Sequence, residues 1–165
     1  MTALNYTIRS PKLSDIDRCY EIESLSYASD EAATREKIAT RIKNYPEGFM
    51  LIEDGNTIIG FINSGSTDHV LMSDDQFKEL IGHDPQGQHN VIMSVVVHPD
   101  FRGQGFSVVL MDNYILRMKA LNKKSIHLMC KEKYIRLYEK SGFNYLQQSG
   151  SSYGGVAWHE MSIML

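Results

Sequence analysis

The sequence predicts one α/β (α+β) domain over residues 1–165, with a mixed central sheet of about six to seven strands flanked by about four helices. A chain of 165 residues can form a core that needs no disulfide or metal for stability. Short β-rich runs alternate with segments of helical spacing along its length. One run, Val91–Val97, is almost continuously apolar and β-branched. This pattern indicates a strand buried on both faces at the centre of a sheet.

The N-terminal part predicts one strand and two helices. Tyr6–Arg9 has the composition of a short strand. A first helix is expected from about Asp15 to Ser26, after a capping-box-like start. Thr34–Asn44 predicts a second helix because Ile38 and Ile42 fall on one face at a spacing of four.

A β-hairpin is expected next. Phe49–Glu53 and Thr57–Asn63 are β-rich and flank Asp54-Gly55, a dipeptide that tolerates the positive φ angles of tight turns. Residues 64–88 are polar and interrupted by glycine and proline. We therefore expect an elaborated loop there, with one short helix over residues 74–81.

The C-terminal half predicts a strand-loop-helix-strand unit followed by closing elements. Apolar side chains at helical spacing support a helix over Phe106–Leu121, and Gly142 ends a shorter one over Tyr134–Ser141. The remaining strands are expected at Ser125–Cys130, Phe143–Gln147 and Val156–Met164, the last two pairing around a Gly- and Ser-rich loop at residues 149–155.

Composition argues against several classes of function. A net charge of −3 with scattered Lys and Arg gives no basic patch for nucleic acid. No run is apolar and long enough to span a bilayer, and the N-terminus lacks a secretory signal, so we expect a cytoplasmic protein with no membrane partner. Cys19 and Cys130 are expected to be reduced thiols. The six histidines show no metal-binding spacing, so no metal is expected.

A glycine-containing turn stands between the predicted central strand and the helix that follows. The turn reads Arg102-Gly103-Gln104-Gly105-Phe106-Ser107. A strand-to-helix turn of small residues points backbone N–H groups and the positive end of a helix dipole at one spot, which suits a pyrophosphate. Neither the Walker A pattern nor GxGxxG is present, which argues against nucleotide hydrolysis and dinucleotide binding.

This turn and Leu137–Phe143, which contains a YEKxGF-like element, resemble the GNAT acetyltransferases in order and separation. The resemblance implies acetyl-CoA as co-substrate and a GNAT-like fold. The resemblance implies that the pantetheine arm of acetyl-CoA pairs with the central strand at Val95, Val96 and Val97. Its pyrophosphate would bind to Arg102, Gly103, Gln104, Gly105, Phe106 and Ser107, the last replacing the usual Gly or Ala. Tyr138 would contact the coenzyme and act as the acid that reprotonates the leaving thiolate.

Within that superfamily the chain most resembles the arylalkylamine N-acetyltransferases, through several segments that include the tail Trp158-His159-Glu160-Met161. Where that family carries two catalytic histidines on the central strand, this sequence has Val91 and Met93. His89, on the same strand face, and Glu23, on the first helix, are therefore the alternative candidates for the catalytic base. Tyr27, Met93 and Trp158 are the candidates for the acceptor-binding site.

The chemistry expected is direct attack of a neutral amine on the thioester. Positioning of two substrates contributes most of the acceleration, and a strand N–H near residues 93–95 polarises the thioester carbonyl. Tyr138, with an ordinary tyrosine pKa of about 10, is protonated at neutral pH and can donate to the thiolate. The expected acceptor is a small amine such as an arylalkylamine or polyamine. A protein or peptide Nα-acetyltransferase and a non-catalytic acetyl-CoA sensor remain alternatives, and the protein is expected to be a monomer or homodimer.

Overall fold

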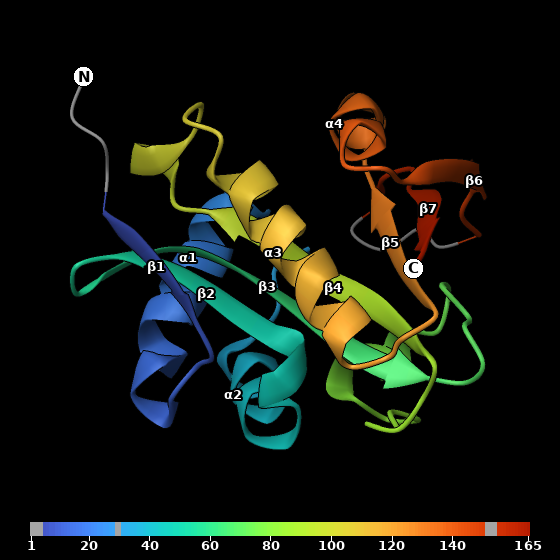
Figure 1. Ribbon diagram of the computed structural model, residues 1–165, viewed down its shortest axis with the longest axis horizontal. Helices are drawn as coiled ribbons and strands as arrows, with labels where there is room; N and C mark the ends of the chain where they lie inside the picture. The colour runs from blue at the N-terminus through green and yellow to red at the C-terminus, as the bar shows by residue number, and fades with distance from the viewer. Residues whose placement is uncertain (1–4, 29–30, 151–154) are drawn as a thin grey trace.

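A seven-stranded mixed sheet forms the centre of the molecule, as seen in a computed structural model that describes residues 5–28, 31–150 and 155–165. Its order is β1-β2-β3-β4-β5-β7-β6, and β4 and β5 are the parallel neighbours (Figure 1). The strands are β1 (Tyr6–Arg9), β2 (Phe49–Asp54), β3 (Thr57–Thr67), β4 (His89–Val97), β5 (Ser125–Cys130), β6 (Asn144–Gln148) and β7 (His159–Met164).

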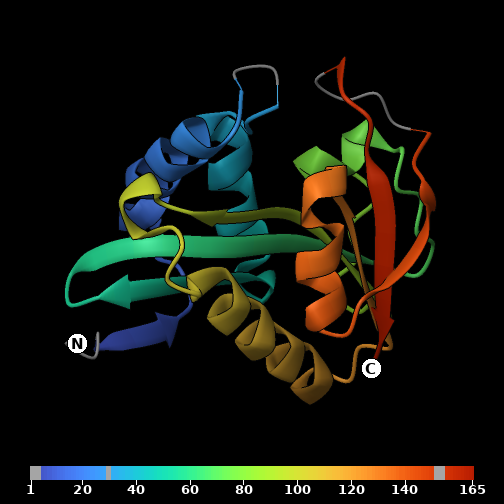
Figure 2. The ribbon, with the colours of Figure 1, turned by 90° about the horizontal axis from the view of Figure 1, so that it is seen from above.

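Helices cover both faces of this sheet. Helices α1 (Ile16–Ser26) and α2 (Arg35–Asn44) lie on one side of the strands and α3 (Phe106–Ala120) on the other (Figure 2). Side chains of α1 and α2 form one buried cluster with β2 and β3, whereas α3 belongs to a second cluster that the short helix α4 (Ile135–Lys140) also contacts. None of the described helices is long and apolar enough to cross a bilayer.

The predicted fold class is confirmed, and most predicted elements have nearly the expected bounds. The short helix expected over residues 74–81 forms as a shorter 3₁₀ helix, η3 (Asp75–Glu79), which ends where Leu80 turns left-handed with φ of 60°. Strand β3 runs past Asn63 to Thr67, since a bulge lets its pairing with β4 continue. Strand β7 begins at His159, and residues 151–154 of the predicted loop lie outside the described part of the chain.

The sheet divides between β4 and β5. The two strands pair only from His89–Val91 to Ser125–His127, and beyond this point they separate. On the other side of β4, the register with β3 shifts so that Met93 is an extra residue, forming a β-bulge that bends the strand. Figure 2 shows β5, β6 and β7 turned away from β1–β4. The free edge of β4 therefore faces a gap between two arms of the sheet.

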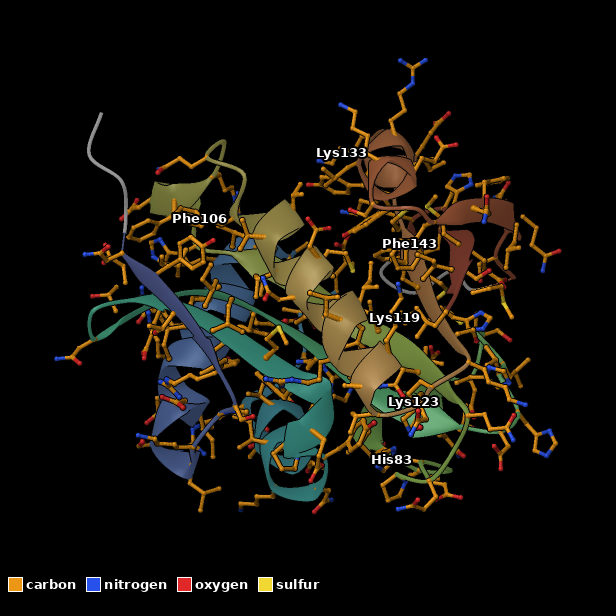
Figure 3. The ribbon with its side chains drawn as sticks, viewed as in Figure 1. His83, Phe106, Lys119, Lys123, Lys133 and Phe143 are labelled. Carbon is orange, nitrogen blue, oxygen red and sulfur yellow. The ribbon has the colours of Figure 1, made fainter. Side chains whose placement is uncertain are left out.

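The loop between β3 and β4 is fastened to the sheet by a buried lysine. The Lys123 ammonium, just before β5, donates to Ser66 Oγ at 2.8 Å and to the carbonyls of Pro85 and Gly87 at 2.8 and 2.6 Å. On the same loop, His83 Nδ1 accepts the Ser66 N–H at 2.8 Å. Lys123 and His83 lie at the end of the molecule where β5 begins (Figure 3).

Substituting Lys123→Met should loosen this loop, because the apolar stem remains but three buried acceptors lose their donor. We expect the free energy of unfolding, measured by urea denaturation, to fall by about 2–4 kcal/mol. Lys124→Met is the matched control, since the neighbouring lysine is exposed. Equal effects of the two substitutions would show that the three hydrogen bonds contribute nothing net.

Candidate active site

A cleft of about 300 Å³ opens where β4 leaves β5. One wall is the free edge of β4 at Val95–Val97, and the other is the end of β5 with α4. Two carbonyls of that edge accept side-chain donors: the Tyr27 hydroxyl bonds to Val95 O at 3.4 Å, and Arg102 Nε bonds to Val97 O at 3.2 Å. This strand edge can therefore exchange hydrogen bonds with an extended ligand.

The glycine turn forms the end of the cleft, after a 3₁₀ helix, η4 (Pro99–Phe101). Gly103 and Gly105 adopt φ angles of 76° and 85°, and no atom lies within 4 Å of where a Cβ would stand on either. Helix α3 begins directly after Gly105, and Phe106 is buried at its first turn (Figure 3). Small residues, open space and a helix N-terminus together suit a bound phosphate. Gln104 is exposed and does not line the cleft, whereas the other predicted residues of the turn do.

Tyr138 lines the same cleft from α4. Its ring meets Phe143 edge-on, and its hydroxyl has no hydrogen-bond partner among the described residues. Burial raises the pKa of Tyr138 above its ordinary value, and the neighbouring Cys130 adds to the rise. The phenol is therefore protonated at neutral pH and has a free donor. Cys130 is buried against Met161, and burial raises the pKa of its thiol to about 11.

A second, smaller cavity of about 80 Å³ adjoins the cleft. The two spaces share three wall residues, Tyr27, Met129 and Trp158. The β3–β4 loop contributes five residues to the cavity wall, namely Leu71, Met72, Asp74, Phe77 and Lys78. The predicted elaborated loop thus lies over this side of β4 and forms one wall of the cavity beside the cleft.

Glu23 is the most unusual group of the cavity. Its side chain comes from α1 and is 2% exposed. Oε2 accepts the Ala33 N–H at 2.9 Å, while buried Oε1 has no hydrogen-bond partner in the described part of the chain. Burial raises the pKa of the Glu23 carboxyl, an effect that the Ala33 N–H, the Arg41 charge and the Ser94 hydroxyl only partly offset. A buried carboxylate of raised pKa in the wall of a cavity suits a proton acceptor.

The bulge in β4 decides which strand residues face this cavity. Neighbouring residues of a regular strand face opposite sides, yet four consecutive residues at the bulge, Val91, Ile92, Met93 and Ser94, line the cavity. No imidazole comes from this strand segment into the cavity, as the sequence indicated. Tyr27, Met93 and Trp158, the predicted acceptor-site residues, do meet in its wall.

His89 lies apart from both spaces. Its Nδ1 is hydrogen-bonded to Ser125 Oγ, and that hydroxyl also contacts His127 Nε2 at 2.9 Å. Burial and the charge of His89 lower the pKa of His127. His89 is thus a component of a separate His–Ser–His cluster and lines neither the cleft nor the cavity. In the described residues, no group of three or more His, Cys, Asp or Glu side chains is arranged to hold a metal.

Sequence reasoning missed two features of the site. Ser94, beside Glu23, is the one polar residue within the apolar run Val91–Val97, and that interruption was a usable signal. The second feature is an ion pair of 2.9 Å between Glu31 in the cavity wall and Lys131 in the cleft wall. These residues are a hundred positions apart, so no local pattern could have joined them.

The comparisons with known proteins agree with this geometry. A family model described as "Acetyltransferase (GNAT) family" matches residues 14–143. No sequence among the curated proteins matches the chain.

Several solved structures share the fold. The loading GNATL domain of CurA from Lyngbya majuscula is 17% identical with a TM-score of 0.85, covering 97% of this chain and 98% of that one. The PaiA N-acetyltransferase of Thermoplasma acidophilum, solved with coenzyme A, is 15% identical with a TM-score of 0.73, covering 98% and 100%. A ribosomal-protein-alanine N-acetyltransferase from Brucella melitensis is 15% identical with a TM-score of 0.72, covering 96% and 99%.

The substitution Gly105→Val tests the glycine turn. A side chain here strains the left-handed backbone and fills the space in front of the α3 amides, so affinity for coenzyme A should fall by a factor of about ten or more, the loss of one charge-assisted hydrogen bond. Isothermal titration calorimetry measures the affinity for coenzyme A. Gly55→Val is the matched control, because Gly55 also has positive φ and open surroundings but lies in the β2–β3 turn. Unchanged affinity in a folded Gly105→Val protein would overturn the assignment of this turn.

Proposed function

Since the chain belongs to the acetyltransferase (GNAT) family, we propose that it transfers the acetyl group of acetyl-CoA to a small primary amine. The observation that carries this proposal is the small cavity that adjoins the cleft, with the buried Glu23 carboxylate in its wall. A long cleft next to a small compartment suits one extended and one compact substrate meeting at their shared wall.

The cleft fits acetyl-CoA in its shape and its hydrogen-bonding groups. The glycine turn and the start of α3 suit the pyrophosphate, and the edge of β4 suits the amide groups of a pantetheine arm. Pairing with the arm would replace the side-chain bonds that Val95 and Val97 now accept. The coenzyme A in the solved Thermoplasma acidophilum relative supports the same ligand class here.

The proposed reaction uses Glu23 as the base and Tyr138 as the acid. Glu23 Oε1 accepts a proton from the amine, the nitrogen attacks the thioester carbonyl carbon, and the carbon–sulfur bond breaks. Tyr138 donates to the sulfur as negative charge develops on it. Because burial raises the pKa of Tyr138, its hydroxyl keeps its proton until negative charge has developed on the sulfur, and the proton is transferred late. His89 is not needed in this scheme.

The position of the β3–β4 loop on the acceptor side of β4 supports a small amine as the acceptor. Residues of the β3–β4 loop line the cavity and take up space on the acceptor side of β4, whereas a peptide acceptor needs a long groove there. A peptide Nα-acetyltransferase is the alternative, since the Brucella melitensis relative is titled as acting on a ribosomal protein. A non-catalytic sensor would need neither Glu23 nor Tyr138.

We also propose a cytosolic location, which the two buried free thiols Cys19 and Cys130 support.

A screen of primary amines and of peptides with free N-termini, followed by coenzyme A release, tests the proposed function. We expect turnover with small amines and little with peptides. Glu23→Gln keeps the shape and the acceptor for the Ala33 N–H but removes the base, so kcat/KM should fall by about 10²- to 10⁴-fold. The low-pH limb of the wild-type profile, where Glu23 becomes protonated, should also disappear.

Stability provides the control for Glu23→Gln. The pKa of Glu23 is raised in the folded protein, so its ionised form weakens folding above that pKa and the penalty vanishes as pH falls. The variant should thus have a Tm equal to or above wild type at pH 8. Wild-type turnover in this variant would exclude Glu23 as the base.

Tyr138→Phe tests the acid. The ring and its packing remain, so folding and acetyl-CoA affinity should change little, while the single-turnover rate should fall by about 10²- to 10⁴-fold. Single-turnover measurement matters because slow product release could hide a loss in the chemical step. A rate within about twofold of wild type would make Tyr138 a packing residue and the mechanism wrong.

A further inference from the structure

We propose that the Glu31–Lys131 ion pair is a clasp that holds the base and the acid of the reaction in position across the divided sheet. This inference rests on the proposed function, in which Glu23 is the base and Tyr138 the acid, and it adds two positioning residues to that function. Glu31 and Lys131 transfer no proton themselves. Each acts through the segment of chain to which it belongs.

The ion pair lies where the smaller cavity meets the cleft. Glu31 lines the cavity and Lys131 lines the cleft, and the two side chains approach to 2.9 Å. The Lys131 ammonium also lies 6.0 Å from the centre of the Trp158 ring, which belongs to the wall shared by both spaces. Glu31 comes from the loop between α1 and α2, whereas Lys131 directly follows β5. The pair therefore links the two arms of the sheet that Figure 2 shows turned away from each other.

The Glu31 end of the clasp belongs to the segment that holds the base. Two residues after Glu31, the Ala33 N–H donates to Glu23 Oε2 at 2.9 Å. Ala33 is itself buried, with 4% of its surface exposed. A shift of this short segment would therefore weaken the hydrogen bond that orients the Glu23 carboxylate.

The Lys131 end belongs to the segment that carries the acid. Lys131 is the N-cap of a 3₁₀ helix, η5 (Glu132–Tyr134), and its carbonyl accepts the Tyr134 N–H at 2.9 Å. Helix α4 begins directly after η5 and contains Tyr138. One ion pair thus connects the loop that orients Glu23 with the helical segment that positions Tyr138.

The two partners differ in burial, and this difference decides what each substitution does. The Glu31 side chain is 4% exposed and the Lys131 side chain 33%. Removal of the lysine charge leaves a buried carboxylate without its counter-charge, which is strongly unfavourable. Removal of the Glu31 charge costs less, because the Lys131 ammonium can turn to water. An unpaired Glu31 gains most by moving towards water, and the Ala33 segment moves with it.

The pH dependence of kcat/KM tests the positioning role in Glu31→Gln, Lys131→Met and the double variant. The Ala33 hydrogen bond stabilises the ionised Glu23 carboxylate, so its loss raises the pKa of Glu23 further. Since only the ionised carboxylate is a base, the acid limb should move to higher pH in both single variants, by about one unit for the loss of one hydrogen bond to a charged group. On that limb kcat/KM should fall about tenfold.

The other titratable groups around Glu23 stay in place in these variants. They are Cys19 and Tyr27 from α1 and its end, Arg41 from α2, and Asp74 and Lys78 from the β3–β4 loop. Glu132→Gln and Lys119→Met are the matched controls, because each removes a charge from an exposed residue that lines neither space. Both should keep the wild-type pH profile.

Amide hydrogen exchange tests the clasp without turnover. The Ala33 N–H should exchange about tenfold faster in both single variants, since its hydrogen bond is weakened. Urea denaturation separates positioning from packing. Lys131→Met should be less stable than the double variant, because Glu31→Gln removes the unpaired buried charge. The acid limb should nevertheless stay shifted in the double variant, which also lacks the clasp.

Failure of the inference differs from failure of the proposed function. An unmoved acid limb and unchanged Ala33 exchange in both single variants would overturn the inference while leaving the acetyltransferase in place. A higher KM for acetyl-CoA in Lys131→Met, with a wild-type profile in Glu31→Gln, would overturn it in favour of direct contact between Lys131 and the coenzyme. Wild-type turnover in Glu23→Gln would remove the base from the proposed mechanism and the positioning role with it.

Discussion

The divergence of β4 from β5 is the constraint on which the rest of the site depends. A parallel pair satisfies its backbone groups only while the strands stay side by side, and here pairing ends at Val91 and His127. The Met93 bulge bends β4 away and also rotates Ser94 into the face that carries Glu23. The cleft, the cavity and their shared wall are consequences of this one interruption in the sheet.

An interrupted sheet leaves backbone groups that need partners, and the protein supplies them from side chains. The Tyr27 hydroxyl and Arg102 Nε satisfy two carbonyls of the β4 edge, while Arg102 also donates to Ser26 Oγ at 3.3 Å. Because side chains occupy these carbonyls, the edge is less available for pairing with a strand of another chain, and a ligand can still replace the side-chain hydrogen bonds. The same side chains thereby link the C-terminal end of α1 to the glycine turn.

Local patterns in the sequence predicted the elements whose structure is decided locally. The Asp54-Gly55 turn is present with Gly55 at φ of 59°, and the turn at Arg102–Ser107 leads into a helix as expected. The motif around Tyr138 singled out a residue that the structure places in the wall of the cleft. The short helix in the β3–β4 loop is shorter than predicted, and the rest of that loop is held by distant contacts such as Lys123 to Gly87, which local propensity does not contain. Cavity volume was beyond prediction for the same reason, since it depends on how Met72 and Phe77 pack on β4.

The raised pKa of Cys130 has a chemical consequence for a cleft of this kind. A thioester exchanges with a thiolate but hardly at all with a protonated thiol. With a pKa of about 11, only about one Cys130 side chain in 10⁴ is ionised at neutral pH. An activated acyl group can therefore lie along the wall that Cys130 helps to form without acylating the protein itself. The apolar setting of this sulfur keeps the reactive carbonyl intact until an amine arrives.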